Sequence, residues 1–188
     1  MKVALLGGSF NPPHVGHLMA AHYVRATQGM DELWLMPAYQ HPFGKALTSF
    51  EHRVRMCEVM CEDTSGWMKT SRVEQEVAER GGAGYTVETL GYLVEKHPDI
   101  RFSLIIGSDI LKDLPNWKSF DRIQQMVRVL VLYRAGYPAS GTVGPPLAEV
   151  SSTQIRDMLT RGELPGEFVP GRVLDYAREA GLYGLGKP

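Results

Sequence analysis

Short apolar runs alternate along this chain with segments in which apolar residues recur every three or four positions. The runs predict β-strands, and the periodic segments predict amphipathic helices. The expected strands cover residues 3–6, 32–37, 68–73, 101–107 and 127–133. The expected helices cover residues 15–27, 49–62, 86–96, about 153–160 and about 170–180.

This alternation predicts an α/β fold, a doubly wound parallel sheet with helices on both faces. The stretch 138–146 is rich in Gly, Pro and Ser and is expected to be a loop. The two helices after it predict a small C-terminal helical subdomain beside the sheet. We expect one domain over residues 1–188, with an α/β core over about 1–137 and the helical part over about 147–188.

The connection between the first strand and the first helix reads GGSFNPPHVGH over residues 7–17. Its two leading glycines permit a tight turn and bring backbone N–H groups close to a ligand. His14 and His17 lie three residues apart where the helix begins, so they point roughly the same way. Exposed N–H groups and the positive end of the helix dipole favour a phosphate there. Metal ligation and incidental surface histidines are the alternatives, although a zinc site needs further ligands.

A second polar segment, VSSTQIR over residues 150–156, opens the first C-terminal helix. Ser or Thr at this place is an N-cap signal, which would make the segment a simple helix start. The same hydroxyls and N–H groups, together with Arg156 in the first turn, can also bind an anionic phosphate. Both interpretations are open from the residues alone.

Residues 8–17 resemble the first signature of the HxGH nucleotidyltransferase superfamily, and residues 151–156 resemble its C-terminal Ser-Ser-Thr-x-Ile-Arg signature. Within the superfamily, the chain is similar to bacterial nicotinate mononucleotide adenylyltransferases over nearly its whole length. The resemblance implies a Rossmann-like nucleotidyltransferase fold. It also implies adenylyl transfer from ATP to nicotinate mononucleotide, which gives nicotinate adenine dinucleotide and pyrophosphate in NAD biosynthesis.

The resemblance further assigns roles at the ATP side of the site. Positioning and positive groups dominate such a reaction, and His14, His17, Lys45 and Arg156 are the expected catalytic residues. Mg²⁺ is expected to arrive with the ATP phosphates, and no carboxylate cluster resembles a metal site of the protein itself. The residues expected to bind ATP are Gly7, Gly8, Ser9, Phe10, His14, Gly16, His17, Gly107, Asp109, Ser151, Ser152, Thr153 and Arg156.

The loop after the second strand departs from the family pattern. Relatives often show Pro-His-Lys or Pro-His-Arg there, whereas Phe43 and Gly44 separate Pro42 from Lys45 in this chain. This leaves Lys45 as the candidate phosphate ligand and the role of His41 open. A solvated surface lysine is the alternative.

Four residues are expected to bind the mononucleotide. Tyr85 and Thr86 resemble the Tyr-Thr-x-x-Thr-Leu segment that lines the pyridine side of the family pocket, although they also fit a plain helix start. Asp109 can accept hydrogen bonds from ribose hydroxyls, and Trp117 offers a face for a pyridine ring. N–H and hydroxyl donors near Thr86 suit the carboxylate of nicotinate better than the amide of nicotinamide.

Composition and charge exclude several classes of protein. A net charge of −1 gives no general field for nucleic acid, and no apolar run is long enough for a membrane span. The N-terminus does not resemble a signal peptide, and Cys57 and Cys61 suit a reducing compartment, so we expect a cytoplasmic enzyme. A homo-oligomer is compatible with the sequence. The alternative functions are transfer to nicotinamide mononucleotide or to another phosphate acceptor, and a nucleotide-sensing domain with little turnover.

Overall fold

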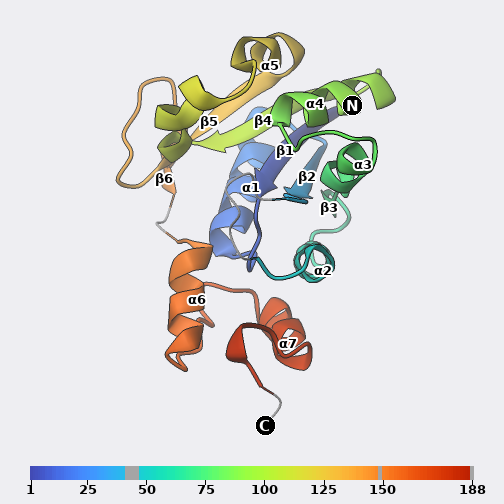
Figure 1. Ribbon diagram of the computed structural model, residues 1–188. Coiled ribbons are helices and arrows are strands. Elements are labelled where there is room, and N and C mark those ends of the chain that lie inside the picture. Colours follow the sequence, from blue (N-terminus) through green and yellow to red (C-terminus); the bar gives the residue numbers. More distant parts are fainter. Residues whose placement is uncertain (41–46, 148–149, 187–188) are drawn as a thin grey trace.

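The computed structural model describes residues 1–40, 47–147 and 150–186. At its centre lies a parallel sheet with strand order β3-β2-β1-β4-β5-β6 (Figure 1). The strands are β1 (Lys2–Gly8), β2 (Glu32–Pro37), β3 (Met68–Thr70), β4 (Arg101–Gly107), β5 (Arg128–Arg134) and β6 (Val143–Leu147). The helices are α1 (Val15–Gln28), α2 (Phe50–Cys61), α3 (Val73–Glu79), α4 (Thr86–Lys96), α5 (Phe120–Met126), α6 (Ser152–Thr160) and α7 (Gly171–Glu179), with 3₁₀ segments η1 (Ser108–Asn116) and η2 (Leu182–Gly184).

Side chains alternate between the two faces of the sheet, as the pleat requires. On β1, Ala4 and Leu6 join the core beneath α1 and α2, whereas Val3 and Leu5 join the core beneath α3, α4 and α5. Because helices cover both faces, the buried residues of the central strands β1 and β4 are apolar except for Ser103. The doubly wound α/β fold expected from the sequence is confirmed.

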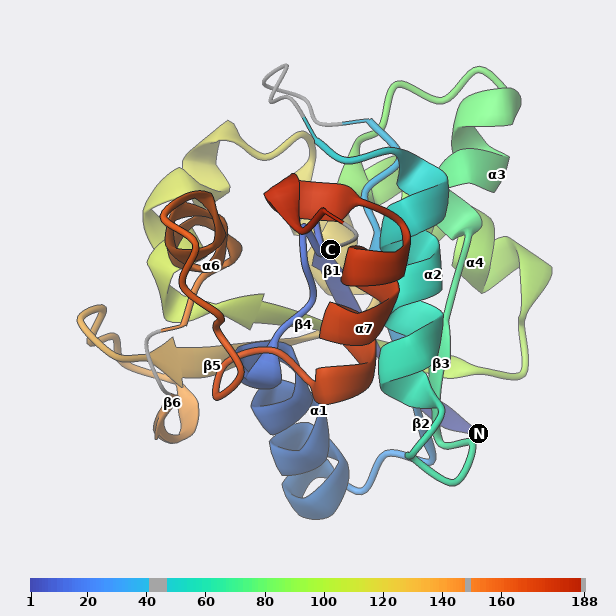
Figure 2. The same cartoon turned by 90° about the horizontal axis from the view of Figure 1, so that it is seen from below.

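The C-terminal helices share the core of α1 and α2. Ile155 and Leu159 on α6, and Val173 and Leu174 on α7, are buried in that cluster. Figure 2 shows α7 alongside α2, and the Tyr176 hydroxyl lies 2.8 Å from Nδ1 of His52 between them. The helical subdomain expected from the sequence is therefore present and packed against the α/β core.

Two local expectations were wrong. Residues 143–147 form the edge strand β6 rather than a loop; an edge strand tolerates Gly144 and the two following prolines, and its pairing with β5 is irregular. The third strand ends at Thr70, because Val73 already begins α3. The segment after β4, to which the sequence pattern assigned no element, is the 3₁₀ segment η1.

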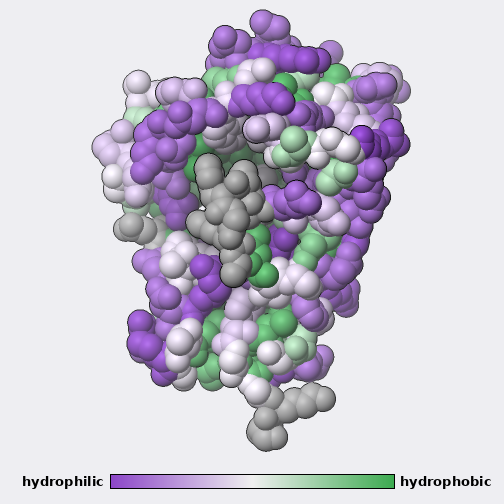
Figure 3. Space-filling model, in the orientation of Figure 1, coloured by the Kyte–Doolittle hydropathy of each residue, from purple (hydrophilic) through white to green (hydrophobic). Residues whose placement is uncertain are grey.

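The surface drawn in Figure 3 is mostly hydrophilic, with hydrophobic residues in smaller patches toward α6 and α7. Among the described residues, no helix is both long and apolar enough to cross a membrane. The strand order places the topological switch point between β1 and β4, where ligands of open α/β sheets bind.

Candidate active site

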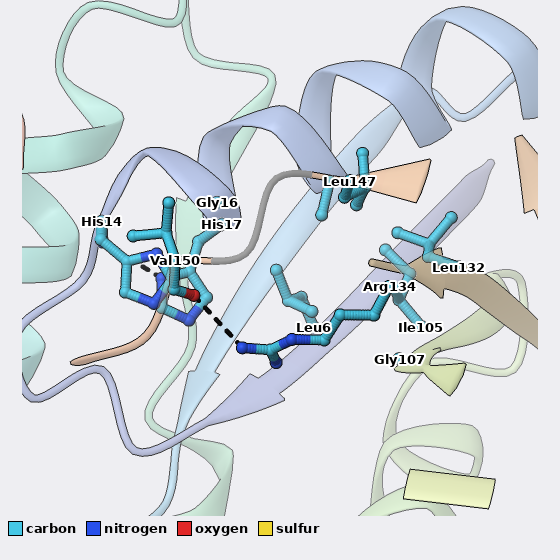
Figure 4. A pocket seen from close by; sticks show the side chains of 11 residues that line it. Leu6, His14, Gly16, His17, Ile105, Gly107, Leu132, Arg134, Leu147 and Val150 are labelled. Atoms are coloured by element: carbon cyan, nitrogen blue, oxygen red, sulfur yellow. Dashed lines mark hydrogen bonds between the residues drawn. The ribbon is translucent and has the colours of Figure 1, made fainter. Parts of the chain in front are cut away.

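A pocket lies at that switch point, beyond the carboxyl ends of β1, β4, β5 and β6 and beside the start of α1 (Figure 4). Its floor is apolar, and its polar groups come from α1 and β5. The lining residues are Leu6, His14, Gly16, His17, Ala20, Ile105, Gly107, Leu132, Arg134, Leu147 and Val150.

His14 and His17 lie together at one end of the pocket (Figure 4). His14 is the N-cap residue of α1, and its backbone N–H donates to Nδ1 of His17 at 3.1 Å. The two imidazole centroids lie 3.8 Å apart, and the Phe10 ring lies 4.6 Å from that of His17. A Cβ atom at Gly16 would stand 3.0 Å from the His14 ring, so glycine makes room for this pair. The common orientation expected from their spacing is confirmed.

Both histidines are neutral near pH 7 in the ligand-free protein. Burial, helped by the positive Arg134, lowers the pKa of His14 to about 4. Burial, with His14 and Arg134, lowers the pKa of His17 well below its usual value. Because Nδ1 of His17 accepts from the backbone, its proton lies on Nε2, which is a hydrogen-bond donor. The imidazoles therefore offer N–H donors rather than the positive charges expected from the sequence.

Arg134, which was not among the residues expected from the sequence, extends across the pocket from the end of β5. Its guanidinium pairs with Oδ2 of Asp109 at 3.2 Å and donates to the Val150 carbonyl at 3.2 Å (Figure 4). Its backbone N–H donates to the hydroxyl of Ser108 at 2.9 Å. A signal was available, because the carboxyl end of a strand predicted to be parallel is where a cation would face a ligand.

Two buried side-chain polar atoms have no hydrogen-bond partner among the described residues: Nδ1 of His14 and Oδ1 of Asp109. Such atoms cost free energy unless water or a ligand satisfies them. A Cβ atom at Gly107 would stand 2.2 Å from Oδ1 of Asp109, so this glycine makes room for the Asp109 carboxylate. Nδ1 of His14 in the pocket and Oδ1 of Asp109, next to the pocket residues Gly107 and Arg134, can therefore each make a further hydrogen bond.

The start of α6 docks directly on the loop that precedes α1. Ser151 caps the helix, and its hydroxyl accepts the Gln154 N–H at 3.2 Å. The hydroxyl of Ser152 donates to the Pro12 carbonyl at 2.8 Å, and the Arg156 guanidinium donates to the Asn11 carbonyl at 2.8 Å. The two signature segments singled out in the sequence are therefore in direct contact in the fold.

Comparison with known proteins agrees with this geometry. The family model described as cytidylyltransferase-like matches residues 5–158. A probable nicotinate-nucleotide adenylyltransferase of Myxococcus xanthus strain DK1622 is 68% identical over 98% of this chain and 96% of the relative. One of Anaeromyxobacter sp. strain K is 48% identical over 97% of this chain and 96% of the relative.

The chain belongs to the nicotinate-nucleotide adenylyltransferases. A solved structure of similar fold is Plasmodium falciparum nicotinic acid mononucleotide adenylyltransferase complexed with NaAD, with a TM-score of 0.83, 19% identity and 98% coverage of both chains. A putative nicotinate-nucleotide adenylyltransferase from Vibrio parahaemolyticus has a TM-score of 0.70 at 19% identity, over 93% of this chain and 96% of that one. At these identities the structural likeness shows the fold.

The residues expected on the pyridine side of this adenylyltransferase lie outside the histidine pocket. Tyr85 is exposed at the start of α4, and Trp117 is half-buried with its ring 6.1 Å from Phe120. Lys118 joins the two segments, since its ammonium lies 4.1 Å from the Tyr85 ring centroid and 3.1 Å from a Glu88 carboxylate oxygen. The segments around Tyr85 and Trp117 are thus neighbours in the fold.

The remaining expectations concern the basic loop and the metal. His41 and Lys45 lie outside the described residues, so their expected roles stay predictions. Within the described ranges, no three or more His, Cys, Asp or Glu side chains gather as a metal site.

Proposed function

We propose that the protein transfers the adenylyl group of ATP to nicotinate mononucleotide, releasing pyrophosphate and forming nicotinate adenine dinucleotide. The observation that carries this proposal is that His14 and His17 line a pocket at the switch point of the sheet, while the start of α6 is hydrogen-bonded to the loop that leads into them. Family membership supports the choice of acceptor, because the named relatives are nicotinate-nucleotide adenylyltransferases.

The chemistry suits a site without a general base. The phosphate of the mononucleotide is already an anionic nucleophile at neutral pH. One of its oxygens forms a bond to the α-phosphorus of ATP, while the bond from that phosphorus to the oxygen bridging to the β-phosphate breaks and pyrophosphate leaves. The protein has to bring two anions together and stabilise the charge that builds up on the phosphoryl oxygens.

We assign that stabilisation to hydrogen-bond donors at the start of α1. The Nε2–H of His17, held in place by the Nδ1 contact, can donate to an α-phosphate oxygen. A neutral imidazole donates without burying a further charge, which fits the low pKa that burial imposes on both histidines. The dipole of α1 adds to the effect.

We assign binding of the β- and γ-phosphates of ATP, which leave as pyrophosphate, to the start of α6. The Arg156 guanidinium donates to the Asn11 carbonyl and, at 3.3 Å, to the hydroxyl of Thr153. Its remaining N–H groups have no acceptor among the described residues and can meet an anion. Lys45, outside the described residues, is the further cation proposed from the sequence. The Asp109 carboxylate near the pocket is already paired with Arg134, so it is a poor ligand for a metal ion. Mg²⁺ would therefore be held at this site mainly by the ATP phosphates. When bound, the metal ion would neutralise phosphate charge.

The proposal is tested by measuring pyrophosphate release from ATP, in the presence of Mg²⁺, with each member of a panel of phosphate acceptors. The panel contains nicotinate mononucleotide, nicotinamide mononucleotide and phosphopantetheine, with CTP replacing ATP in a parallel series. We expect release only when ATP and a pyridine mononucleotide are both present. ATP binding without turnover of any acceptor would instead support the nucleotide-sensing alternative.

A further inference from the structure

Arg53 is a cation on the buried face of α2. Its neighbours on that face, Val54, Met56 and Cys57, are apolar core residues. Arg53 is buried with them and is only 2% exposed, although it is charged. Arginine is rarely buried to this extent without a partner of opposite charge. The position therefore needs a physical explanation.

The guanidinium of Arg53 is bound by neutral carbonyl groups. It donates to the Ser9 carbonyl at 2.9 Å and to the Thr48 carbonyl at 2.9 Å. No carboxylate among the described residues lies within ion-pair distance of it. Burial lowers the pKa of Arg53, but a guanidinium keeps its charge at neutral pH. A full positive charge therefore lies behind the loop that carries Ser9.

The hydrogen bond to Ser9 fixes the orientation of one peptide group. In a trans peptide the N–H points away from the C=O, so holding the Ser9 carbonyl toward α2 turns the Phe10 N–H to the opposite side. Phe10 has a φ of 48°, a left-handed conformation that is strained for a bulky residue and persists only when its surroundings impose it. Arg53 on one side and the ring of His17 on the other supply that constraint.

The next carbonyl groups of the same loop are also taken by donors from outside it. Arg156 binds the Asn11 carbonyl and Ser152 binds the Pro12 carbonyl. The backbone N–H groups of Phe10 and Asn11, in contrast, meet no acceptor within the described residues. A loop with its carbonyls tied back and its N–H groups free is shaped for an anion.

We propose that Arg53 is a positioning residue of the phosphate site. It holds the Ser9–Phe10 peptide so that the N–H groups of the loop face the phosphates of the nucleotide, and those phosphates balance its buried charge. The inference rests on the proposed function only in that the bound nucleotide is taken to be ATP.

The test compares Arg53→Met, Arg53→Lys and Arg55→Met by calorimetric titration with ATP and Mg²⁺, without any acceptor. Arg55 is a matched control, because it lies on the same helix but is half-exposed and pairs with Glu58 and Glu62. Arg53→Met removes the charge-assisted hydrogen bond to the Ser9 carbonyl and the positive charge behind the loop. We therefore expect this variant to bind ATP about tenfold to a hundredfold more weakly. Arg53→Lys, which keeps the charge, should recover part of that loss, and Arg55→Met should bind like the wild type.

Steady-state kinetics separate positioning from a merely structural role. Positioning predicts a raised KM for ATP in the Arg53 variants, with the KM for nicotinate mononucleotide within about twofold of the wild type. A lowered melting temperature with unchanged ATP affinity would overturn the inference. If Arg53→Met does not fold, Arg53→Lys decides alone: ATP affinity equal to the wild type would overturn the inference, and weaker binding would support it. Because the titration contains no acceptor, a protein that binds ATP but ignores nicotinate mononucleotide would contradict only the proposed function.

Discussion

The Arg156 guanidinium donates to the main-chain carbonyl of Asn11 at 2.8 Å, although 145 positions separate the two residues. Asn11 is 2% exposed, and its side-chain oxygen accepts the Tyr183 hydroxyl at 2.7 Å. The loop that leads into α1 is thus held by the C-terminal helices. Changes in those helices are therefore expected to act on the phosphate site.

Replacing Arg156 by Ala should weaken the binding of ATP more than the binding of the mononucleotide. The change removes a cation from the proposed phosphate site and leaves the buried Asn11 carbonyl without its donor. We expect the KM for ATP to rise at least about tenfold, with a loss of about 1–3 kcal/mol in the free energy of unfolding. Initial rates at varied ATP and urea denaturation measure the two effects.

Arg161→Ala is the matched control for that experiment. Arg161 follows α6 directly, is exposed and pairs with the nearby Glu163. Its loss should leave the KM for ATP and the stability nearly unchanged. If Arg156→Ala behaves like Arg161→Ala, the α6 start is a helix cap and not a phosphate site.

His17→Ala should lower kcat while the protein stays folded. Removal of one preorganised donor to a developing anion typically costs about 100- to 1,000-fold in turnover. His17 also accepts the His14 N–H, so His17→Gln, which keeps a polar side chain, is a useful companion variant. Circular dichroism checks the fold. A folded His17→Ala protein with a near-normal kcat would remove His17 from the proposed mechanism.

The buried histidines should make the ligand-free protein less stable in mild acid. The pKa of His14 is about 4 in the folded chain, against an ordinary value of 6.5 when unfolded. Below pH 6.5 the unfolded state binds the proton more strongly, so stability is complete above that pH and falls as the pH drops toward 4. His14 contributes up to about 3 kcal/mol of this loss, and His17 acts in the same direction.

Urea unfolding at pH 7.5 and at pH 5 measures that dependence. His14→Gln should lose about 2 kcal/mol less between the two pH values than the wild type does. Equal losses in the two proteins would show that His14 is not held neutral by burial.

Asp109→Ala should reduce discrimination between ribose and deoxyribose nucleotides. The free Oδ1 of Asp109 has no partner among the described residues, and a ribose hydroxyl is a suitable donor to it. A charge-assisted bond of this kind predicts that the wild type prefers ATP over 2′-deoxy-ATP or 3′-deoxy-ATP by about tenfold or more, and the variant by less than about threefold. Comparison of kcat/KM for the three nucleotides measures this, and an unaltered preference in the variant would place Asp109 elsewhere.

The sequence predicted the sheet well because its central strands β1 and β4 are buried on both faces and their buried residues are apolar except for Ser103. It did not reveal β6, since an edge strand has one free side and can accommodate Gly144 and two prolines. It also missed α3 and α5, because helices of seven residues are too short to show clear periodicity.

Where local sequence carries the chemistry, as at His14, His17 and the α6 start, it indicated candidate residues that the fold brings near one another. Arg134 and Arg53 were not predicted because their contacts are with residues distant in sequence. Arg134 binds Asp109 and the Val150 carbonyl, and Arg53 binds the Ser9 carbonyl. The protonation of the histidines also depends on the fold, since burial lowers their pKa values. Apart from the place of Arg134 at the carboxyl end of a predicted strand, no local pattern indicates these contacts.

An internal competition between two acceptors tests the central claim most directly. Nicotinate and nicotinamide mononucleotides are supplied at equal concentration with ATP and Mg²⁺, and the two dinucleotide products are separated and quantified at early times. Their ratio equals the ratio of kcat/KM, and His17→Ala protein purified in parallel excludes a contaminating enzyme. Two charge-assisted hydrogen bonds to the carboxylate predict a ratio of at least tens-fold, on the order of a hundredfold, in favour of nicotinate adenine dinucleotide. Equal amounts of the two products, or an excess of the nicotinamide product, would contradict the account.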